Sequence, residues 1–208
     1  ALSQCSIDLP WEAPTAHYEA MRDALALRAK LLPYIYTAAR HAYDTGVGLI
    51  RPMYFDYPTS EMAYAVNASG AGISQYMFGD DMFAAPIVAP ADNATAPVPW
   101  QVGVATKTVW IPPGGWCELP SGTCYLRGNW SVMKKFPLSE VPLYARAGAV
   151  VPSVPLVDGA TVGAAAAQYT SLVFDIFPGA AKGDTKVYED DGATTAYLDG
   201  ATFAWLSA

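Results

Sequence analysis

The sequence is poor in charged residues and in long apolar runs. Of its 208 residues 15% are charged, and the formal net charge is −7 with a pI near 4.6. Nucleic-acid binding requires a basic face, so a nucleic-acid partner is not expected. No stretch of 18 apolar residues occurs, so the sequence predicts no membrane span.

Cysteine is scarce, with three residues in the whole sequence. Cys117 and Cys124 flank a turn that contains Pro120 and Gly122, which brings the two thiols together at a hairpin end. In an oxidising compartment we expect a disulfide between them, and the alternative is two buried free thiols. Cys5 is left over, and an odd cysteine near a chain end can pair with something outside this sequence.

Hydrophobic residues, glycine and proline are plentiful instead. The sequence is 52% hydrophobic, with 17 Gly and 17 Pro, which is typical of a β-rich, turn-rich globular protein. Its longest periodic stretch, residues 15–45, predicts one long helix with an apolar stripe formed by Met21, Leu25, Leu32, Ile35, Tyr36, Ala39 and Tyr43. Thr15 is expected to cap its start and Gly46 its end, and Pro33 predicts a kink.

Short strands separated by turn residues follow the helix. Residues 76–90 predict a turn and a buried strand, residues 59–75 a short helix or loop, and residues 141–152 a strand interrupted by a glycine. Further strands are expected at residues 49–57, 107–111, 117–119, 124–126, 169–177 and 186–188. This spacing favours a β-sandwich, so the fold class is mainly β with one long N-terminal helix.

Two arginines lie in apolar strands, where a charge requires a partner. They are Arg51 and Arg146, and a structural ion pair with Asp80 or Asp81 is the expected role. Asp80 and Asp81 are neighbours, so on a strand they point to opposite faces and cannot act together as an acid and a base. We therefore predict that this acidic pair bonds backbone amides at a turn.

Other residues that could suggest metal or sugar binding also have a simpler structural interpretation. Residues 189–191 (EDD) lack the alternating ligands of a calcium loop, so an acidic turn closed by Gly192 is expected. His17 and His41 are interpreted as partly exposed helix residues. Five aromatics are expected to pack between sheets, with a sugar-stacking platform as the alternative: Trp100, Trp110, Trp116, Tyr125 and Trp130.

Three N-glycosylation sequons occur, at Asn67, Asn93 and Asn129. Together with the expected disulfide they favour the secretory pathway, without choosing among a lumenal, a lysosome-like and an extracellular location.

Six short segments, taken in order, resemble glycoside hydrolase family 31, the α-glucosidase family. The segments are residues 27–37 (LRAKLLPYIYT), 51–53 (RPM), 79–86 (GDDMFAAP), 111–116 (IPPGGW), 141–152 (VPLYARAGAVVP) and 187–192 (VYEDDG). Trp11 matches a tryptophan that family members carry before the long helix. The resemblance covers the C-terminal portion of the family.

This resemblance implies an architecture. Residues 1–46 would end a catalytic (β/α)8 barrel with its last helix, residues 47–155 would form a proximal C-terminal β-sandwich, and residues 156–208 would begin a distal β domain. Without its barrel the helix would expose a large apolar patch. We therefore expect this polypeptide to be unstable alone and to associate with the remainder of the same enzyme.

The resemblance also implies chemistry that lies outside this chain. Family members are retaining α-glycosidases that use a nucleophilic aspartate and a second carboxylic acid, both on barrel strands. No residue here matches a catalytic residue, and no cofactor or metal is expected. The chain would be part of an enzyme that hydrolyses terminal α-linked sugars, inactive alone, with an α-linked oligosaccharide as substrate. The alternative is a non-catalytic β-sandwich that binds glycans or serves an assembly.

Overall fold

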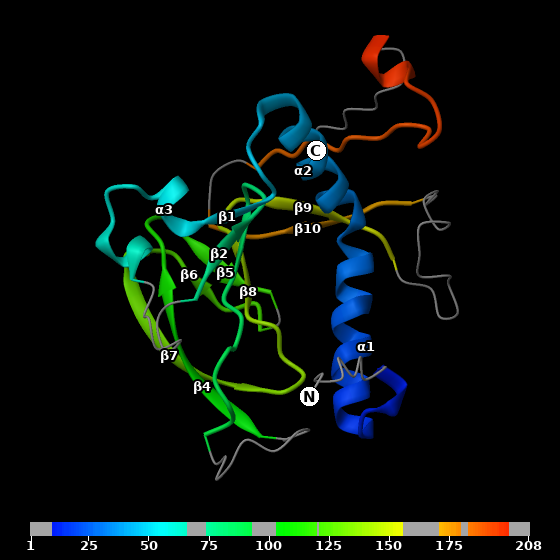
Figure 1. Cartoon of the computed structure of the whole chain (residues 1–208). Helices are drawn as coiled ribbons and strands as arrows, with labels where there is room; N and C mark the ends of the chain where they lie inside the picture. Colours follow the sequence, from blue (N-terminus) through cyan, green and yellow to red (C-terminus); the bar gives the residue numbers. More distant parts are fainter. Residues whose placement is uncertain are drawn as a thin grey trace, which may run out of the picture.

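The structure is a computed structural model that describes residues 10–65, 74–92, 103–119, 121–155, 171–179 and 183–199. It is mainly β with few helices, in agreement with the expected class. Its helices α1 (Thr15–Lys30) and α2 (Leu32–Thr45) lie on one side of a six-stranded sheet, and the strand pair β4 (Val104–Ile111) and β7 (Trp130–Pro137) lies on the other side (Figure 1).

The expected single helix is broken into two helices at Leu31 (φ −82°, ψ 11°). Pro33 thereby falls in the first turn of α2, where its missing N–H would have had no partner in the helix. Gly46 ends α2 with a φ of 75°, as predicted. The predicted cap is wrong, because Pro14 occupies the N-cap position and Thr15 is already helical.

None of the residues assigned to the apolar stripe is fully buried, although Ile35 is half-buried against the sheet, and the buried helix residues lie outside the stripe. Leu31 and Tyr34 contact the sheet and are 3% and 6% exposed. Leu25 and Tyr43, which we assigned to the stripe, are 54% and 67% exposed. The periodicity therefore marks an apolar helix face that the described part of the chain does not cover.

The six-stranded sheet is antiparallel and has the order β1-β2-β3-β8-β5-β6. Its strands are β1 (Ile50–Pro52), β2 (Tyr76–Phe78), β3 (Met82–Ala84), β8 (Leu143–Arg146), β5 (Trp116–Glu118) and β6 (Cys124–Tyr125). Side chains alternate between two apolar layers. Phe83 and Tyr144 stack toward the β4–β7 side with ring centroids 4.6 Å apart, whereas Met82 and Ala145 face the helices.

The predicted strand at residues 141–152 is two strands in different sheets. Gly148, at φ 90°, lies between β8 and β9 (Val150–Ser153). β9 leaves the large sheet and pairs with β10 (Val173–Ile176) beside α2 (Figure 1). The domain boundary expected at residue 155 therefore lies between β9 and β10, which pair with each other.

Two local strand predictions were wrong, and one strand was missed. The strand expected at residues 49–57 is β1 followed by a short helix, α3 (Met53–Asp56), so the alternation we assigned to residues 53–57 is helical. β7 was not predicted. Residues 186–188 form no strand, although Val187 and Tyr188 are buried.

The remaining elements are single turns of 3-10 helix: η1 (Pro10–Glu12), η2 (Glu61–Tyr64) and η4 (Ala196–Asp199). η2 agrees with the short helix or loop expected for residues 59–75. Among the residues described, no helix is long and apolar enough to cross a membrane.

Candidate functional site

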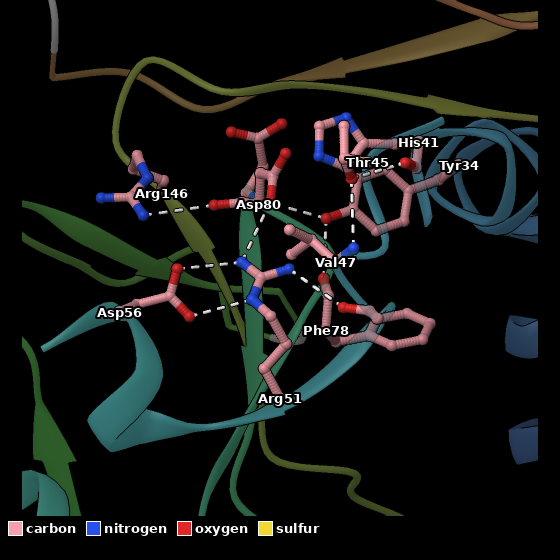
Figure 2. A network of polar contacts seen from close by, with 11 residues as sticks. Tyr34, His41, Thr45, Val47, Arg51, Asp56, Phe78, Asp80 and Arg146 are labelled. Atoms are coloured by element: carbon pink, nitrogen blue, oxygen red, sulfur yellow. Dashed lines mark hydrogen bonds and ion pairs between the residues drawn. The ribbon is translucent and has the colours of Figure 1, made fainter. Parts of the chain in front are cut away.

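Arg51 is the centre of a polar network that joins separate elements of the chain (Figure 2). It lies on β1 and is 5% exposed. Its Nε and Nη2 donate to the two carboxylate oxygens of Asp56 at 3.0 and 2.9 Å, and Nη2 also donates to Asp80 at 3.0 Å. Nη1 donates to the carbonyl of Gly48 at 3.2 Å. The hydrogen bonds to Asp56 raise the pKa of Arg51, so the guanidinium stays charged.

The predicted partnership of Arg51 with Asp80 or Asp81 is thus resolved in favour of Asp80. Asp56 was missed because a strand at residues 49–57 would have carried it away from Arg51. The turn of α3 brings it back, five positions along the chain. This bidentate pair therefore joins β1 to α3.

Tyr34 connects helix α2 to the same turn. Its hydroxyl donates to the carbonyl of Phe78 at 2.7 Å and accepts from the backbone N–H of Asp81 at 3.2 Å. Gly79 is required here, because its φ is 69° and a Cβ would collide with the Tyr34 hydroxyl. The acidic turn after β2 is thereby fixed against the helix layer through backbone groups of Phe78 and Asp81, and not through a carboxylate bonded to backbone amides as predicted.

Arg146 completes the junction from the end of β8. Its Nη2 donates to the Asp80 carbonyl at 3.2 Å, and its guanidinium lies 4.7 Å from the centroid of the Trp116 ring. Asp81 is half-buried, and this burial raises the pKa of its carboxyl, although the charge of Arg146 lowers that pKa in part.

A second buried acid, Glu118, was not singled out by the sequence. It is fully buried on β5 and accepts hydrogen bonds from Lys134 Nζ at 2.6 Å, Ser121 Oγ at 2.5 Å and the Tyr144 hydroxyl at 3.2 Å. The sequence feature that could have pointed to Glu118 is an acidic residue directly after a cysteine in a predicted strand. With an ion pair and two hydroxyl donors, Glu118 has the environment of a structural carboxylate.

These carboxylates are arranged for holding elements together. Asp56 and Asp80 share one guanidinium, and Glu118 is enclosed by its donors. Neither arrangement places two carboxyl groups across an open cleft, as glycoside hydrolysis requires. Within the described ranges, no group of three or more His, Cys, Asp or Glu residues could hold a metal ion.

The acidic turn near the C-terminus binds helix α2. Asp190 accepts hydrogen bonds from the hydroxyls of Tyr36 and Tyr188 at 2.7 and 2.6 Å, and Gly192 N–H donates to it at 2.9 Å. The guanidinium of Arg40 lies 5.0 Å from the centroid of the Tyr188 ring. The predicted acidic turn is present, and the carboxylates of Asp190 and Asp191 are used in local bonds.

Cys117 and Cys124 form the expected disulfide, which joins β5 to the edge strand β6. Asn129 is exposed in the turn between β6 and β7, with a φ of 73°. Asn67, Asn93, Cys5 and Trp100 lie outside the described residues. His41 is exposed as expected, whereas His17 is buried at 8% exposure, which corrects that prediction.

A groove runs between α1 and the β layers. It has a volume of about 740 Å³ and is lined by Leu27 and Lys30 of α1, by Lys134 of β7 and by Phe177 after β10. A second groove of about 700 Å³ lies beside it, over Pro86, Ile87 and Phe136.

Comparison with known proteins identifies the family. The sequence profile of the glycosyl hydrolase family 31 C-terminal domain matches residues 46–151. A 1,6-alpha-glucosyltransferase of Sporosarcina globispora is 32% identical over 93% of this chain, and an alpha-xylosidase of Saccharolobus solfataricus is 29% identical over 92% of it. The chain spans 14% and 23% of the lengths of these two relatives.

Solved structures agree with the sequence relatives. A family 31 dextranase of Flavobacterium johnsoniae superimposes with a TM-score of 0.75 and 28% identity, over 96% of this chain and 22% of that one. The match extends across both helices and the sheets, beyond the residues that the family profile covers. This chain belongs to glycoside hydrolase family 31, and its residues 46–151 are the C-terminal domain of that family.

Proposed function

We propose that this chain is the C-terminal part, or a subunit, of a retaining α-glycosidase that hydrolyses terminal α-linked sugars. The observation that carries the proposal is the match to the C-terminal domain of the family, in a chain that spans 14% of its 1,6-alpha-glucosyltransferase relative. The carboxylates described above are engaged in structural bonds, which supports catalytic aspartates located elsewhere in the enzyme.

In this proposal α1 and α2 are the last helical part of a catalytic barrel, residues 47–155 a proximal sandwich and residues 156–208 the start of a distal β domain. The exposed apolar face of the helices supports it, with Leu25 at 54% and Tyr43 at 67% exposed. So does the groove along α1. A soluble monomer rarely leaves such surface open, so the remainder of the enzyme is the proposed partner.

The protein is proposed to mature in the secretory pathway. The disulfide Cys117–Cys124 supports an oxidising compartment, and Asn129 is exposed in a turn, as a glycosylated asparagine must be. Asn67 and Asn93 remain candidate sequons.

The proposal is tested on the natural protein by intact mass under reducing conditions, followed by assays on α-glucosides and α-xylosides. A larger polypeptide, or a second chain, that releases the sugar with retained α-configuration in the initial NMR spectrum supports the proposal. Inversion of configuration, or a natural product of these 208 residues alone without activity, contradicts it. The 208-residue chain expressed alone is expected to be inactive and poorly soluble.

A further inference from the structure

Helix α2 is in contact with residues 183–199, which are drawn in orange to red in Figure 1. This segment is buried at Tyr188, whereas residues 191–195 are exposed and the segment ends in η4. Residues 191–199 are named the strap. Two of the aromatics that the sequence singled out are fully buried in the core instead, as the packing interpretation predicted: Trp110 and Trp116.

Local hydrogen bonds fold the strap. The carboxylate of Asp191 accepts from the N–H of Ala193 at 3.1 Å and from the N–H and hydroxyl of Thr194 at 2.9 and 2.6 Å. In η4 the N–H of Leu198 donates to the carbonyl of Thr195 at 2.9 Å. Each of these bonds lies within the strap, so they shape it without attaching it to the rest of the molecule.

The strap is attached to α2 through Tyr197. Its ring meets that of Tyr43 edge to face, with centroids 6.4 Å apart and an interplanar angle of 84°. The guanidinium of Arg40 lies 5.3 Å from the centroid of the same Tyr197 ring. Among the described residues, these are the ring contacts that join the strap to the helix.

Arg40 is enclosed by rings from both elements. Its guanidinium lies 5.0 Å from the centroid of Tyr188, 5.4 Å from that of Tyr43 and 5.3 Å from that of Tyr197. Asp44, one turn further along α2, accepts a hydrogen bond from its Nε at 2.9 Å. A guanidinium is planar and weakly hydrated, so it packs against aromatic rings better than an ammonium does. Arg40 therefore links the buried Tyr188 to Tyr197 on the strap.

The chain before the strap is held on α2 by other bonds. The hydroxyl of Tyr36 donates to Asp190 at 2.7 Å, and the N–H of Tyr188 donates to Thr37 Oγ1 at 2.9 Å. Neither bond involves Arg40. Loss of the ring cluster around Arg40 would therefore release the strap and leave the preceding residues in place.

We propose that the strap closes on α2 and opens from it as a local unit, with Arg40 as the residue that holds it closed. Regions with few buried apolar contacts open without global unfolding. Cation–π contacts at exposed sites are individually weak, so the three rings around Arg40 act together, and removal of their common cation opens the strap. In the enzyme of the proposed function the strap would attach the start of the distal β domain to the last barrel helix, and this consequence alone rests on that function.

The test is limited thermolysin digestion of the full-length natural protein, with the products identified by mass spectrometry. Thermolysin cuts before large apolar residues, and a cut before Leu198 requires η4 to unfold and extend. When opening and closing are faster than cutting, the cleavage rate follows the open population. The Arg40→Met variant is expected to be cut at this bond at least fivefold faster than the wild type, while the urea midpoint of global unfolding stays close to the wild-type value.

Three further variants separate the ring cluster from other effects. Arg22→Met is the matched control, because Arg22 also pairs with a carboxylate on its own helix, at 2.8 Å, but lies on α1. Asp44→Asn removes the ion pair and keeps the guanidinium among the rings. Both are expected to stay within twofold of the wild-type cleavage rate. Arg40→Lys keeps the charge without the planar group and should be cut at least threefold faster.

A wild-type cleavage rate in Arg40→Met would overturn the proposal, as would an equal acceleration in Asp44→Asn or in Arg22→Met. If Arg40→Met does not fold, Tyr197→Ala replaces it with the same expected direction, because it removes the ring on the strap and leaves α2 unchanged. Hydrolysis of an α-glycoside by the wild type is measured separately. Its absence would refute the proposed function, while the cleavage rates still decide the strap.

Discussion

Helix α2 takes part in two polar clusters that differ in burial. Tyr34 faces the sheet and bonds the turn beside Arg51, in a cluster whose central guanidinium is 5% exposed. Tyr36 is 39% exposed and bonds the half-buried Asp190, so this cluster is the more exposed of the two although Tyr188 within it is buried. The first cluster joins α2 to the six-stranded sheet. The second joins α2 to residues 183–199, which pair with none of the described strands. A hydrogen bond contributes more to stability when it is buried, because water competes with exposed hydrogen bonds.

Removal of the buried guanidinium should give the largest effect. Arg51→Met leaves Asp56 and Asp80 without their common partner and removes the ion pair between β1 and α3. A loss of about 3 kcal/mol in the free energy of unfolding is expected, near the lower end for a broken buried pair because both carboxylates are partly exposed. Urea denaturation of the full-length protein measures it. A loss below about 1 kcal/mol would show that the network is no stronger than a surface pair.

The disulfide should rank next. Cys117 and Cys124 close a loop of sequence separation 7. For so short a loop the chain-entropy estimate is about 2.5 kcal/mol. The Cys117→Ser/Cys124→Ser variant should therefore denature at lower urea, and the addition of reductant should lower the wild type to the same midpoint. A wild-type midpoint that reductant leaves unchanged would mean that this bond is absent from the natural protein or contributes nothing.

The two tyrosines of α2 allow the comparison to be made with one matched substitution. Tyr34→Phe leaves the buried N–H of Asp81 without its acceptor and should cost about 1–2 kcal/mol. Tyr36→Phe removes a solvent-competed bond and should cost less than about 0.5 kcal/mol. It should instead increase proteolysis within residues 183–199, since this bond helps to hold the segment to α2. Equal losses of stability from the two variants would contradict the role of burial.

The smallest effect is a pH dependence of opposite sign at the two clusters. The hydrogen bond from the Tyr188 hydroxyl is the main cause of the lowered pKa of Asp190. The stability that ionised Asp190 contributes is therefore present above pH 3.8 and is lost as pH falls through the folded pKa. Burial raises the pKa of Asp81, so ionisation costs stability once pH rises above 3.8. We expect Asp190→Asn to destabilise at pH 7 and Asp81→Asn to stabilise. Both differences should shrink at pH 3, and thermal unfolding at the two pH values checks them.

The elements that the sequence predicted are those with a local signal. Gly46 ended the helix as expected, Pro33 marked the break, and the turn with Gly122 placed the two cysteines together. Asp80 was recognised as a partner because a charge in an apolar strand requires one. These inferences depend on a few adjacent residues and on the cost of burying a charge.

What was missed depends on contacts far along the chain. Asp56 reaches Arg51 through a helical turn inside an apolar, aromatic stretch that reads as a strand. β7 carries Lys134 and Lys135, and its pairing with β4 rather than its own sequence makes it a strand. Tyr54 and Tyr64 are ordinary aromatics in the sequence, and their stacking appears once α3 and η2 are folded.

The borders of the six-stranded sheet have a consequence for how copies of this protein behave at high concentration. Its two outermost strands are β1, three residues long with Pro52 at its end, and β6, two residues long and covalently tied to β5. A foreign strand would find few free backbone groups along either border, and Pro52 has no N–H to offer. The folded sheet is therefore a poor template for aggregation by strand addition, whereas a reduced and opened β6 would expose a longer border.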